Sequence, residues 1–344
     1  MTEEILFSRE NHIGLVKLNR PQALNALTLH MILALQHQLR VWEDDTNIHA
    51  VIVQSEGGRA FCAGGDVRAI YHHGRENIQK KMAFFGHEYR LNEYIHDFGK
   101  PYIALMDGIT MGGGVGISLH GSHPVASERF VFAMPETGIG FYPDIGASHI
   151  LSRCPGYFGI YLGLTGSRLG AVDAQALGLV KHLIPSDRFT DVLTSLVEAD
   201  LSTDAHQRVS DVLYQFIMPV SPAPISELAP VVHACFQHRN IESILGSLEN
   251  KGDDWCQETL RVLAKKAPLS LKVTVAQLRK AELMTMAECL QMDYCLTHHF
   301  MCAPDFHEGV RALLVDKDNL PHWHPETLAD VTDDRVAACF EMFD

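Results

Sequence analysis

The hydrophobic pattern of the chain changes near its middle. Up to about Pro185, short apolar runs alternate with glycine-containing turns, whereas from about Asp187 onward glycine is sparse and long amphipathic stretches take over. Short apolar runs between turn residues are typical of strands, and apolar residues that recur every three or four positions are typical of helices. We therefore predict an α/β region over residues 1–186 and a mainly helical region over residues 187–344.

Several apolar runs predict strands in the first region. They are Ile13–Leu18, Ala50–Gln54, Tyr102–Asp107 and Phe130–Ala133. After Thr28, apolar residues recur at helical spacing from Leu29 to Trp42, and the threonine hydroxyl can cap the start of a helix. The predicted order is therefore strand, strand, helix, repeated along the chain.

Amphipathic stretches predict a series of helices in the second region. They cover residues 187–201, 205–217, 225–239, 253–266, 270–281 and 286–301. A further helix is expected to begin near Pro304, because Asp305 offers an acidic cap and Glu308 follows three residues later.

Composition narrows the classes of function. The 344 residues include 28 lysines and arginines against 42 aspartates and glutamates, which gives a formal net charge of −14. This negative field disfavours a nucleic-acid or anionic-membrane partner. No apolar run approaches the roughly 18 residues of a bilayer span, and the first residues lack the basic start of a signal or transit peptide. A soluble, cytoplasmic protein is expected.

The eight cysteines show no C-x-x-C spacing, and a chain of this length needs no disulfides to form a core. Reduced and mostly buried thiols are expected.

Two glycine clusters stand between β-rich and helical stretches. They are Ala63–Asp66 and Met111–Gly116, and a dinucleotide fingerprint starting at Gly112 fails because Ile117 occupies its last glycine position. Such clusters serve as turns or close-packing points in many proteins. Their backbone N–H groups can also converge on a carbonyl oxygen that becomes an oxyanion during a reaction.

The loop Met134–Asp144 places two acids, Glu136 and Asp144, among glycines, prolines and aromatic residues. Burial in such apolar surroundings raises a carboxyl pKa, which suits a general base or acid near neutral pH. The alternative is a structural glutamate that caps a helix or pairs with an arginine, and the residues alone leave both interpretations open.

Other chemistries are not supported by the motifs. The serine-hydrolase pattern G-x-S-x-G fails at His120, and the zinc pattern H-E-x-x-H fails at Leu91 and at Arg311. We therefore expect no metal and no separate cofactor.

Several longer motifs carry a resemblance to a known family. They are Asn19–Leu27, Ala60–Val67, Lys100–Gly108 with the run Gly112–Gly114, and Pro135-Glu136. In them the chain resembles the crotonase (enoyl-CoA hydratase/isomerase) superfamily. Within it, the chain is most similar to the 3-hydroxyisobutyryl-CoA hydrolases, through Gly108–Gly116, Phe132–Thr137, Asp305–Ala312 and Asp316-Lys317-Asp318.

The resemblance implies a fold and a reaction centre. The fold would be a spiral of ββα units followed by a mainly helical region. The N–H groups of Gly65 and Gly113 would form an oxyanion hole for the thioester, and Glu136 would be the catalytic carboxylate. Asp144 and Glu88 would surround the 3-hydroxyacyl group, either orienting it or assisting proton transfer.

Four further residues of the two glycine clusters would contact the acyl-CoA substrate. They are Ala63, Gly64, Asp66 and Gly112. Basic residues near the motifs are candidates for the CoA phosphates, although the sequence does not choose among them. They are Arg20, Arg59, Arg68, Lys80 and Lys81. Family members are often trimers, so a homo-oligomer is one option for this chain.

One departure from the hydratases favours hydrolysis. Hydratases of the superfamily carry a second catalytic glutamate where this chain has Gly116. Addition of water to a double bond uses one group to activate water and one to protonate carbon, whereas thioester hydrolysis needs an oxyanion hole and one carboxylate. The expected function is cleavage of 3-hydroxyisobutyryl-CoA, and also of 3-hydroxypropionyl-CoA, in valine catabolism. The alternatives are an enoyl-CoA isomerase or hydratase and a non-catalytic CoA-binding protein.

Overall fold

The computed structural model describes residues 3–74, 77–219 and 221–342, and the chain forms two compact units. Unit 1 contains the described residues of Met1–Gly65, Arg90–Phe132 and Leu169–Ser226. Unit 2 contains those of Asp66–Tyr89, Ala133–Arg168 and Glu227–Asp344. The units interleave along the chain, and the predicted division near residue 186 stays a prediction.

A six-stranded sheet forms the centre of unit 1. Its strands, in spatial order, are β1 (Ile5–Glu10), β2 (Ile13–Leu18), β3 (Ala50–Ser55), β5 (Tyr102–Met106), β7 (His123–Ala126) and β10 (His182–Leu183). β1 and β2 form an antiparallel hairpin, and the later strands pair in parallel. The strands predicted from the apolar runs are confirmed, with ends that differ by one residue in three of them.

A second, smaller sheet is built from strands that alternate along the chain with strands of the first sheet. It contains β4 (Ala60–Cys62), β6 (Ile109–Met111), β8 (Val131–Ala133) and β9 (Leu169–Gly170). The pairs β3 and β4, β5 and β6, and β7 and β8 each send their first strand to the large sheet and their second to the small one. Helical segments follow the pairs: α1 (Leu29–Asp44), α2 (Val67–His72), α4 (Gly113–Gly116) and α5 (Ala147–Leu151). The predicted ββα repeat is confirmed.

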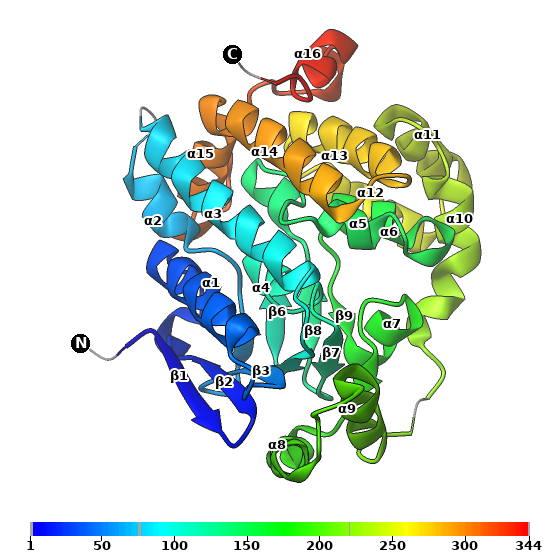
Figure 1. Cartoon of the computed structure of the whole chain (residues 1–344). Coiled ribbons are helices and arrows are strands. Elements are labelled where there is room, and N and C mark those ends of the chain that lie inside the picture. The colour runs from blue at the N-terminus through cyan, green and yellow to red at the C-terminus, as the bar shows by residue number, and fades with distance from the viewer. Residues whose placement is uncertain (1–2, 75–76, 220, 343–344) are drawn as a thin grey trace. The chain divides into compact units, whose positions relative to one another are not determined.

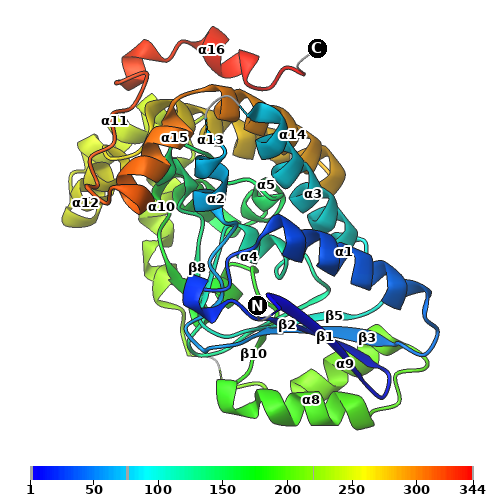
Figure 2. The ribbon, with the colours of Figure 1, turned by 90° about the vertical axis from the view of Figure 1, so that its left-hand side faces the viewer.

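Helices cover both faces of the six-stranded sheet (Figures 1 and 2). α8 (Phe189–Glu198) and α9 (Ala205–Tyr214) bury apolar side chains against one face of β2, β3, β5 and β7. α1 lies over the other face, where Trp42 fits against Gly14 so closely that a Cβ there would lie 2.7 Å from the indole. Thr28 caps α1 as predicted, because its hydroxyl accepts a hydrogen bond from the Met31 N–H.

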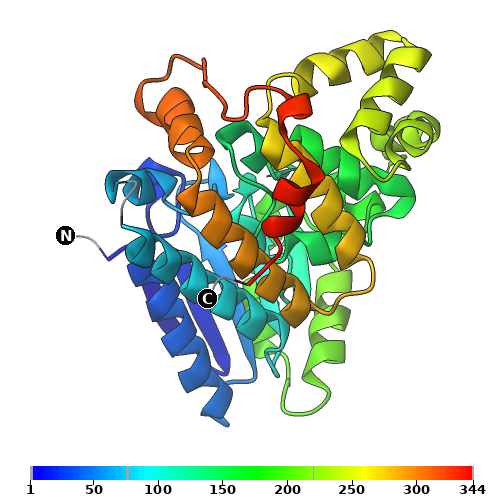
Figure 3. The same cartoon turned by 90° about the horizontal axis from the view of Figure 1, so that it is seen from above.

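Unit 2 is mainly helical and is organised around α13 (Pro268–Ala281), ten of whose side chains are buried. Besides α2 and α5, its other helices are the start of α3 (Ile78–His96), α6 (Phe158–Thr165), α10 (Ala229–Phe236), α11 (Ile241–Lys251), α12 (Asp254–Leu263), α14 (Met286–Cys302), α15 (Asp305–Val310) and α16 (Asp333–Ala338). Figure 3 shows α13 and α14 side by side, with α16 in red across α13. Prolines at the first turns of α10 and α13 suit positions whose N–H has no partner within the helix.

Two details of the helical region differ from the sequence-based prediction. The helix near Pro304 exists, but Asp305 does not cap it, since its Oδ1 accepts a hydrogen bond from the His324 N–H at 2.7 Å instead. α11 was not predicted, although Asn240 caps it by accepting from the Ser243 N–H. A capping box does occur, at Thr285 and Glu288 before α14.

The cysteines are unpaired, and all but Cys302 are buried, as expected. Among the described residues, every helix falls short of the length and apolar character required to cross a membrane.

Candidate active site

The two glycine clusters meet within unit 1. Gly64 has a φ of +112° and Gly112 a φ of +47°, which are left-handed values that glycine adopts without strain. A Cβ on Gly64 would lie 3.4 Å from the Met111 carbonyl oxygen and 3.7 Å from the Gly113 nitrogen. The loops after β4 and β6 are therefore neighbours, as the oxyanion-hole prediction requires.

Backbone N–H groups remain available at this junction. Among the described residues, neither Gly65 N–H nor Gly113 N–H has a hydrogen-bond acceptor. Gly112 precedes α4, and its carbonyl accepts from the Val115 N–H at 2.8 Å. A Cβ on Gly114 would lie 2.1 Å from the Cys62 carbonyl oxygen, so only glycine lets α4 pack this closely on β4. The two free N–H groups can stabilise negative charge on an oxygen.

The position of the second hydratase glutamate is filled by another side chain. A Cβ on Gly116 would lie 2.6 Å from Asn92 Nδ2 and 3.1 Å from its Oδ1. Asn92 is fully buried, and its amide atoms find no hydrogen-bond partner among the described residues. A side chain at position 116 would therefore have to displace the buried Asn92 amide.

Three predicted carboxyl groups are buried together in unit 2. Glu136 begins the 3-10 turn Glu136–Ile139, Asp144 ends the following loop, and Glu88 comes from α3. Their exposed fractions are 6%, 5% and 2%. Among the described residues, Glu136 Oε2 and Glu88 Oε1 have no hydrogen-bond partner. No arginine in the described part of the chain pairs with Glu136 or Glu88, and the three acids are buried.

Burial shifts the pKa of each of these carboxyls upward. Loss of hydration raises the pKa of Asp144 to about 7, and it raises those of Glu136 and Glu88 well above their ordinary values. The charge of Asp144 raises the pKa of the other two further, because like charges resist ionising together. With a pKa of about 7, Asp144 exchanges its proton near neutral pH.

Lys266 is the cation associated with Glu136. It lies in the turn between α12 and α13, where the Ala267 N–H donates to the Thr137 carbonyl oxygen at 3.1 Å. Its Nζ would lie 3.3 Å from a Cβ on Gly138, two residues beyond Glu136. The Lys266 charge lowers the pKa of Glu136, and partial burial lowers the pKa of Lys266 itself. Lys266 therefore favours the ionised form of Glu136.

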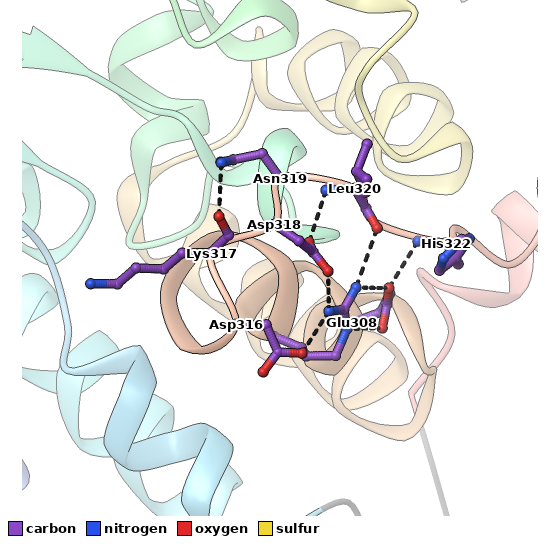
Figure 4. A network of polar contacts seen from close by, with 8 residues as sticks. Glu308, Asp316, Lys317, Asp318, Asn319, Leu320 and His322 are labelled. Atoms are coloured by element: carbon purple, nitrogen blue, oxygen red, sulfur yellow. Dashed lines mark hydrogen bonds and ion pairs between the residues drawn. The ribbon is translucent and has the colours of Figure 1, made fainter.

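A cavity of about 860 Å³ in unit 2 is lined by Lys266 and Gly138. Part of its wall, from Asn319 to Trp323, is held by an ion-pair network centred on Arg311 (Figure 4). Arg311 donates to both oxygens of Glu308 and also to the carboxylates of Asp316 and Asp318. The network shapes the cavity beside the 3-10 turn.

Three hydroxyl groups connect Asp144 to α14. The Tyr89 hydroxyl lies 2.7 Å from Asp144 Oδ2 and 2.6 Å from Thr297 Oγ1. The Tyr142 hydroxyl lies 2.7 Å from the same Thr297 oxygen and donates to the Asp293 carbonyl oxygen at 2.6 Å. All these side chains are buried, so Asp144 belongs to a cluster of polar groups that is shielded from solvent.

Asp293 fixes the loop that carries Asp144. Its Oδ2 accepts from the Gly146 N–H at 2.8 Å, and its Oδ1 accepts from Gln277 Nε2 at 2.9 Å. The same Gln277 nitrogen donates to the Pro143 carbonyl oxygen. Sequence reasoning missed Asp293, Thr297 and Lys266, because nothing in their local sequence distinguishes them from ordinary helix or turn residues.

Other predicted site residues have identifiable structural partners. Asp66 caps α2 by accepting from the Ala69 N–H, and the Ala63 N–H donates to the Leu24 carbonyl oxygen. Arg20 pairs with Glu4 at 3.1 Å, and the buried Lys81 donates to the Met301 carbonyl oxygen at 3.1 Å. Their predicted contacts with CoA stay predictions. No cluster of metal-ligating side chains is found among the described residues.

Comparison with known proteins decides the family. The family model described as enoyl-CoA hydratase/isomerase matches residues 13–340. This chain belongs to that family. The 3-hydroxyisobutyryl-CoA hydrolase, mitochondrial, of Xenopus laevis is 41% identical over 340 residues, covering 97% of this chain and 88% of its own length. The protein of the same description from Homo sapiens is 40% identical over 339 residues, covering 96% and 87%.

Solved structures of family members confirm the fold. A carnitinyl-CoA dehydratase from Mycobacterium thermoresistibile superposes with a TM-score of 0.93 at 35% identity, covering 100% of this chain and 98% of its own. An enoyl-CoA hydratase from Rhodobacter sphaeroides gives 0.89 at 33% identity, covering 98% and 97%. The α/β crotonase fold with a largely helical C-terminal region is thus established, and the family acts on acyl-CoA thioesters.

Proposed function

We propose that this enzyme hydrolyses short 3-hydroxyacyl-CoA thioesters, with 3-hydroxyisobutyryl-CoA, an intermediate of valine catabolism, as its main substrate. The observation that carries the proposal is Gly116 packed against Asn92, because this position then lacks the second glutamate of a hydratase. A site with one catalytic glutamate and an oxyanion hole suits thioester hydrolysis. The relatives at about 40% identity that are described as hydrolases support the same choice.

The proposed mechanism uses the glycine loops to stabilise charge. The N–H groups of Gly65 and Gly113 receive the thioester oxygen and hold it as negative charge develops there. One such donor typically lowers the barrier by about 3 to 4 kcal/mol. CoA then leaves as its sulfur separates from the carbonyl carbon.

Glu136 acts on the carbonyl carbon by one of two routes. It attacks directly to give an acyl-enzyme anhydride, which water then opens, or it activates a water that attacks in its place. In water enriched in oxygen-18, an anhydride that water opens at its glutamyl carbon introduces label into the Glu136 carboxyl group, as measured by mass spectrometry of its peptide. Label in Glu136 would establish the anhydride, because the direct route never breaks a carbon–oxygen bond of Glu136.

Glu88 and Asp144 give the proposal its substrate preference. Their buried carboxyl groups offer polar partners for a 3-hydroxyl group, which a purely apolar pocket lacks. A site built to hydrogen-bond a hydroxyl strongly rejects the analogue without one, because its polar groups are then left unpaired. The enzyme should therefore prefer 3-hydroxyisobutyryl-CoA to isobutyryl-CoA.

A second candidate is enoyl-CoA hydration or double-bond isomerisation. It is favoured by the solved relatives described as a dehydratase and a hydratase at 35% and 33% identity. An isomerase can work with a single glutamate placed like Glu136, so the choice of substrate separates the candidates.

The test compares free CoA released from the two isobutyryl substrates. We expect hydrolysis of 3-hydroxyisobutyryl-CoA to be faster by at least about tenfold. Glu88→Gln and Asp144→Asn should reduce that ratio, whereas Asp305→Asn, a change at a buried acid bonded to His324, should preserve it. Equal rates on both substrates in the wild type would refute the assignment of the 3-hydroxyl site.

A further inference from the structure

A buried side-chain amide on α3 has no hydrogen-bond partner. Asn92 is fully buried, and neither its Nδ2 nor its Oδ1 makes a hydrogen bond to any described residue. Exchanging the positions of these two atoms changes nothing, because both lack a partner. The great majority of buried polar groups are hydrogen-bonded, and an unmatched one costs free energy. The amide of Asn92 is therefore a place where a ligand can supply bonds that the protein itself does not make.

The amide lies against the helix that begins with the predicted oxyanion donor. A Cβ on Gly116, the last residue of α4, would lie 2.6 Å from Asn92 Nδ2 and 3.1 Å from Oδ1. Gly113 begins α4 three residues earlier, so it lies on the same side of that helix. All three residues belong to unit 1. The Gly113 N–H and the Asn92 amide are thus separated by about one helical turn, or about 5 Å along the axis.

The two unmatched atoms specify the chemistry of the ligand. Oδ1 needs a proton donor, and Nδ2 needs an acceptor. A ketone or a carboxylate would satisfy only Nδ2, and an alkyl group would satisfy neither atom. A hydroxyl group satisfies both, because it donates one proton and accepts through its lone pairs. Its second lone pair is left for the carboxyl groups to which the proposed function assigns the same hydroxyl.

The length of a 3-hydroxyacyl chain fits this arrangement. Three carbon atoms lie between the carbonyl oxygen of the thioester and its 3-hydroxyl oxygen. This chain, with one hydrogen bond at each end, is long enough to span the helical turn between the Gly113 N–H and the Asn92 amide. A thioester held by its carbonyl oxygen at Gly113 can therefore present its 3-hydroxyl group to Asn92.

We propose that the Asn92 side-chain amide binds the 3-hydroxyl group of the substrate and determines the preference for hydroxyacyl thioesters. The inference rests on the proposed function for the identity of the substrate. With 3-hydroxyisobutyryl-CoA bound, the amide gains both of its missing bonds. With isobutyryl-CoA bound, the same amide lies unmatched under an alkyl group, which disfavours that ligand.

The experiment measures binding in the absence of turnover. Titration calorimetry compares the dissociation constants of 3-hydroxyisobutyryl-CoA and isobutyryl-CoA in Glu136→Gln and in Glu136→Gln with Asn92→Ala. We expect Glu136→Gln to bind the hydroxyacyl thioester at least about tenfold more tightly than isobutyryl-CoA. Asn92→Ala should weaken binding of the hydroxyacyl thioester by about tenfold and change that of isobutyryl-CoA by less than about twofold, so the preference is lost.

Ser118→Ala is the matched control in the same background. Ser118 is fully buried just beyond the end of α4, and its hydroxyl donates to the Gly114 carbonyl oxygen at 2.6 Å. Its polar group is therefore bonded within the protein, and its removal should leave the preference between the two thioesters unchanged. If Asn92→Ala does not fold, Asn92→Val carries the same prediction, because valine fills more of the space and supplies no hydrogen bond.

Three outcomes would overturn the inference. An unchanged preference in the Asn92 variant would show that the amide does not read the hydroxyl, and an equal loss of affinity for both thioesters would indicate a structural role. The third is an unchanged binding preference with equally slowed CoA release from both thioesters in Asn92→Ala alone, which would assign the amide to the attacking water. All three leave the proposed function standing.

A different result separates failure of the proposed function. Equal affinity of Glu136→Gln itself for the two thioesters would refute the 3-hydroxyl site as a whole, and the inference with it. Because binding is measured without turnover, a preference that Asn92→Ala removes supports the inference even if the wild-type enzyme releases no CoA.

Discussion

Glu136 combines a buried carboxyl group, a raised pKa and a neighbouring lysine, and on these properties we propose it as the reactive group. Glu136→Gln keeps the shape of the side chain and removes its charge. We expect release of CoA from 3-hydroxyisobutyryl-CoA to fall by about 10² to 10⁴. Thermal unfolding should show an intact fold, and Glu326→Gln on the exposed C-terminal segment is a control that should keep full activity.

Asp144 should make stability depend on pH. Its pKa is about 7 in the fold against 3.8 in an unfolded chain, so the neutral form is favoured by folding. The stability from this group is fully present below pH 3.8 and is lost as the pH rises to about 7. The loss is on the order of 4 kcal/mol.

Asp144→Asn removes this titration, so the free energy of unfolding of the variant should not show the loss that wild type shows as the pH rises. From pH 4 to pH 8, the free energy of unfolding of the variant should rise relative to wild type by a few kcal/mol. Urea unfolding at both pH values measures the difference. A constant difference would show that Asp144 ionises as easily in the fold as in water.

Glycine is favoured at position 116 because a side chain there would meet Asn92, and not because of a left-handed backbone conformation. Gly116→Ala places a methyl group 2.6 Å from Asn92 Nδ2 and should lower the free energy of unfolding by about 1 to 3 kcal/mol. The matched control is Gly246→Ala in α11, where a Cβ meets no atom within 4 Å and should stabilise the helix by up to about 1 kcal/mol. Urea unfolding should show changes of opposite sign, and equal changes would contradict the packing argument.

At the scale of elements, the segment after α15 depends on a single side chain. Arg311 joins Glu308, Asp316, Asp318 and the Leu320 carbonyl oxygen (Figure 4). Arg311→Ala should speed hydrogen exchange over residues 316–322 and leave α13 protected, as measured by mass spectrometry. Arg261→Ala breaks one exposed pair with Glu258 and should leave that segment unchanged. Equal exchange in both variants would show that the network does not hold the segment.

The helices and strands were largely predictable, because the spacing of apolar residues along a segment shows which of its side chains are buried. Both end residues of β2 were predicted correctly, and Thr28 was identified as the cap of α1. The cap at Asp305 was wrong, because the distant His324 N–H takes the carboxylate that the local pattern assigned to the helix. Local sequence does not reveal such competition between partners.

At the scale of the whole molecule, the ββα repeat and the helical region followed from apolar patterning, and the family followed from the glycine motifs and Pro135-Glu136. The residues that surround Glu136, Asp144 and Glu88 could not be predicted from the sequence. Tyr89 and Thr297 are 208 residues apart, and their contact exists only in the folded chain. Sequence therefore nominated Glu136, Asp144 and Glu88, whereas their protonation depends on partners that only the tertiary structure supplies.

We propose that this enzyme hydrolyses a thioester rather than hydrating a double bond. The most direct measurement mixes the enzyme separately with 3-hydroxyisobutyryl-CoA and crotonyl-CoA, and follows free thiol and enoyl absorbance in each. We expect thiol release from the hydroxyacyl substrate, none after Glu136→Gln, and no loss of enoyl absorbance from crotonyl-CoA. Loss of enoyl absorbance without release of CoA would contradict it and make the enzyme a hydratase.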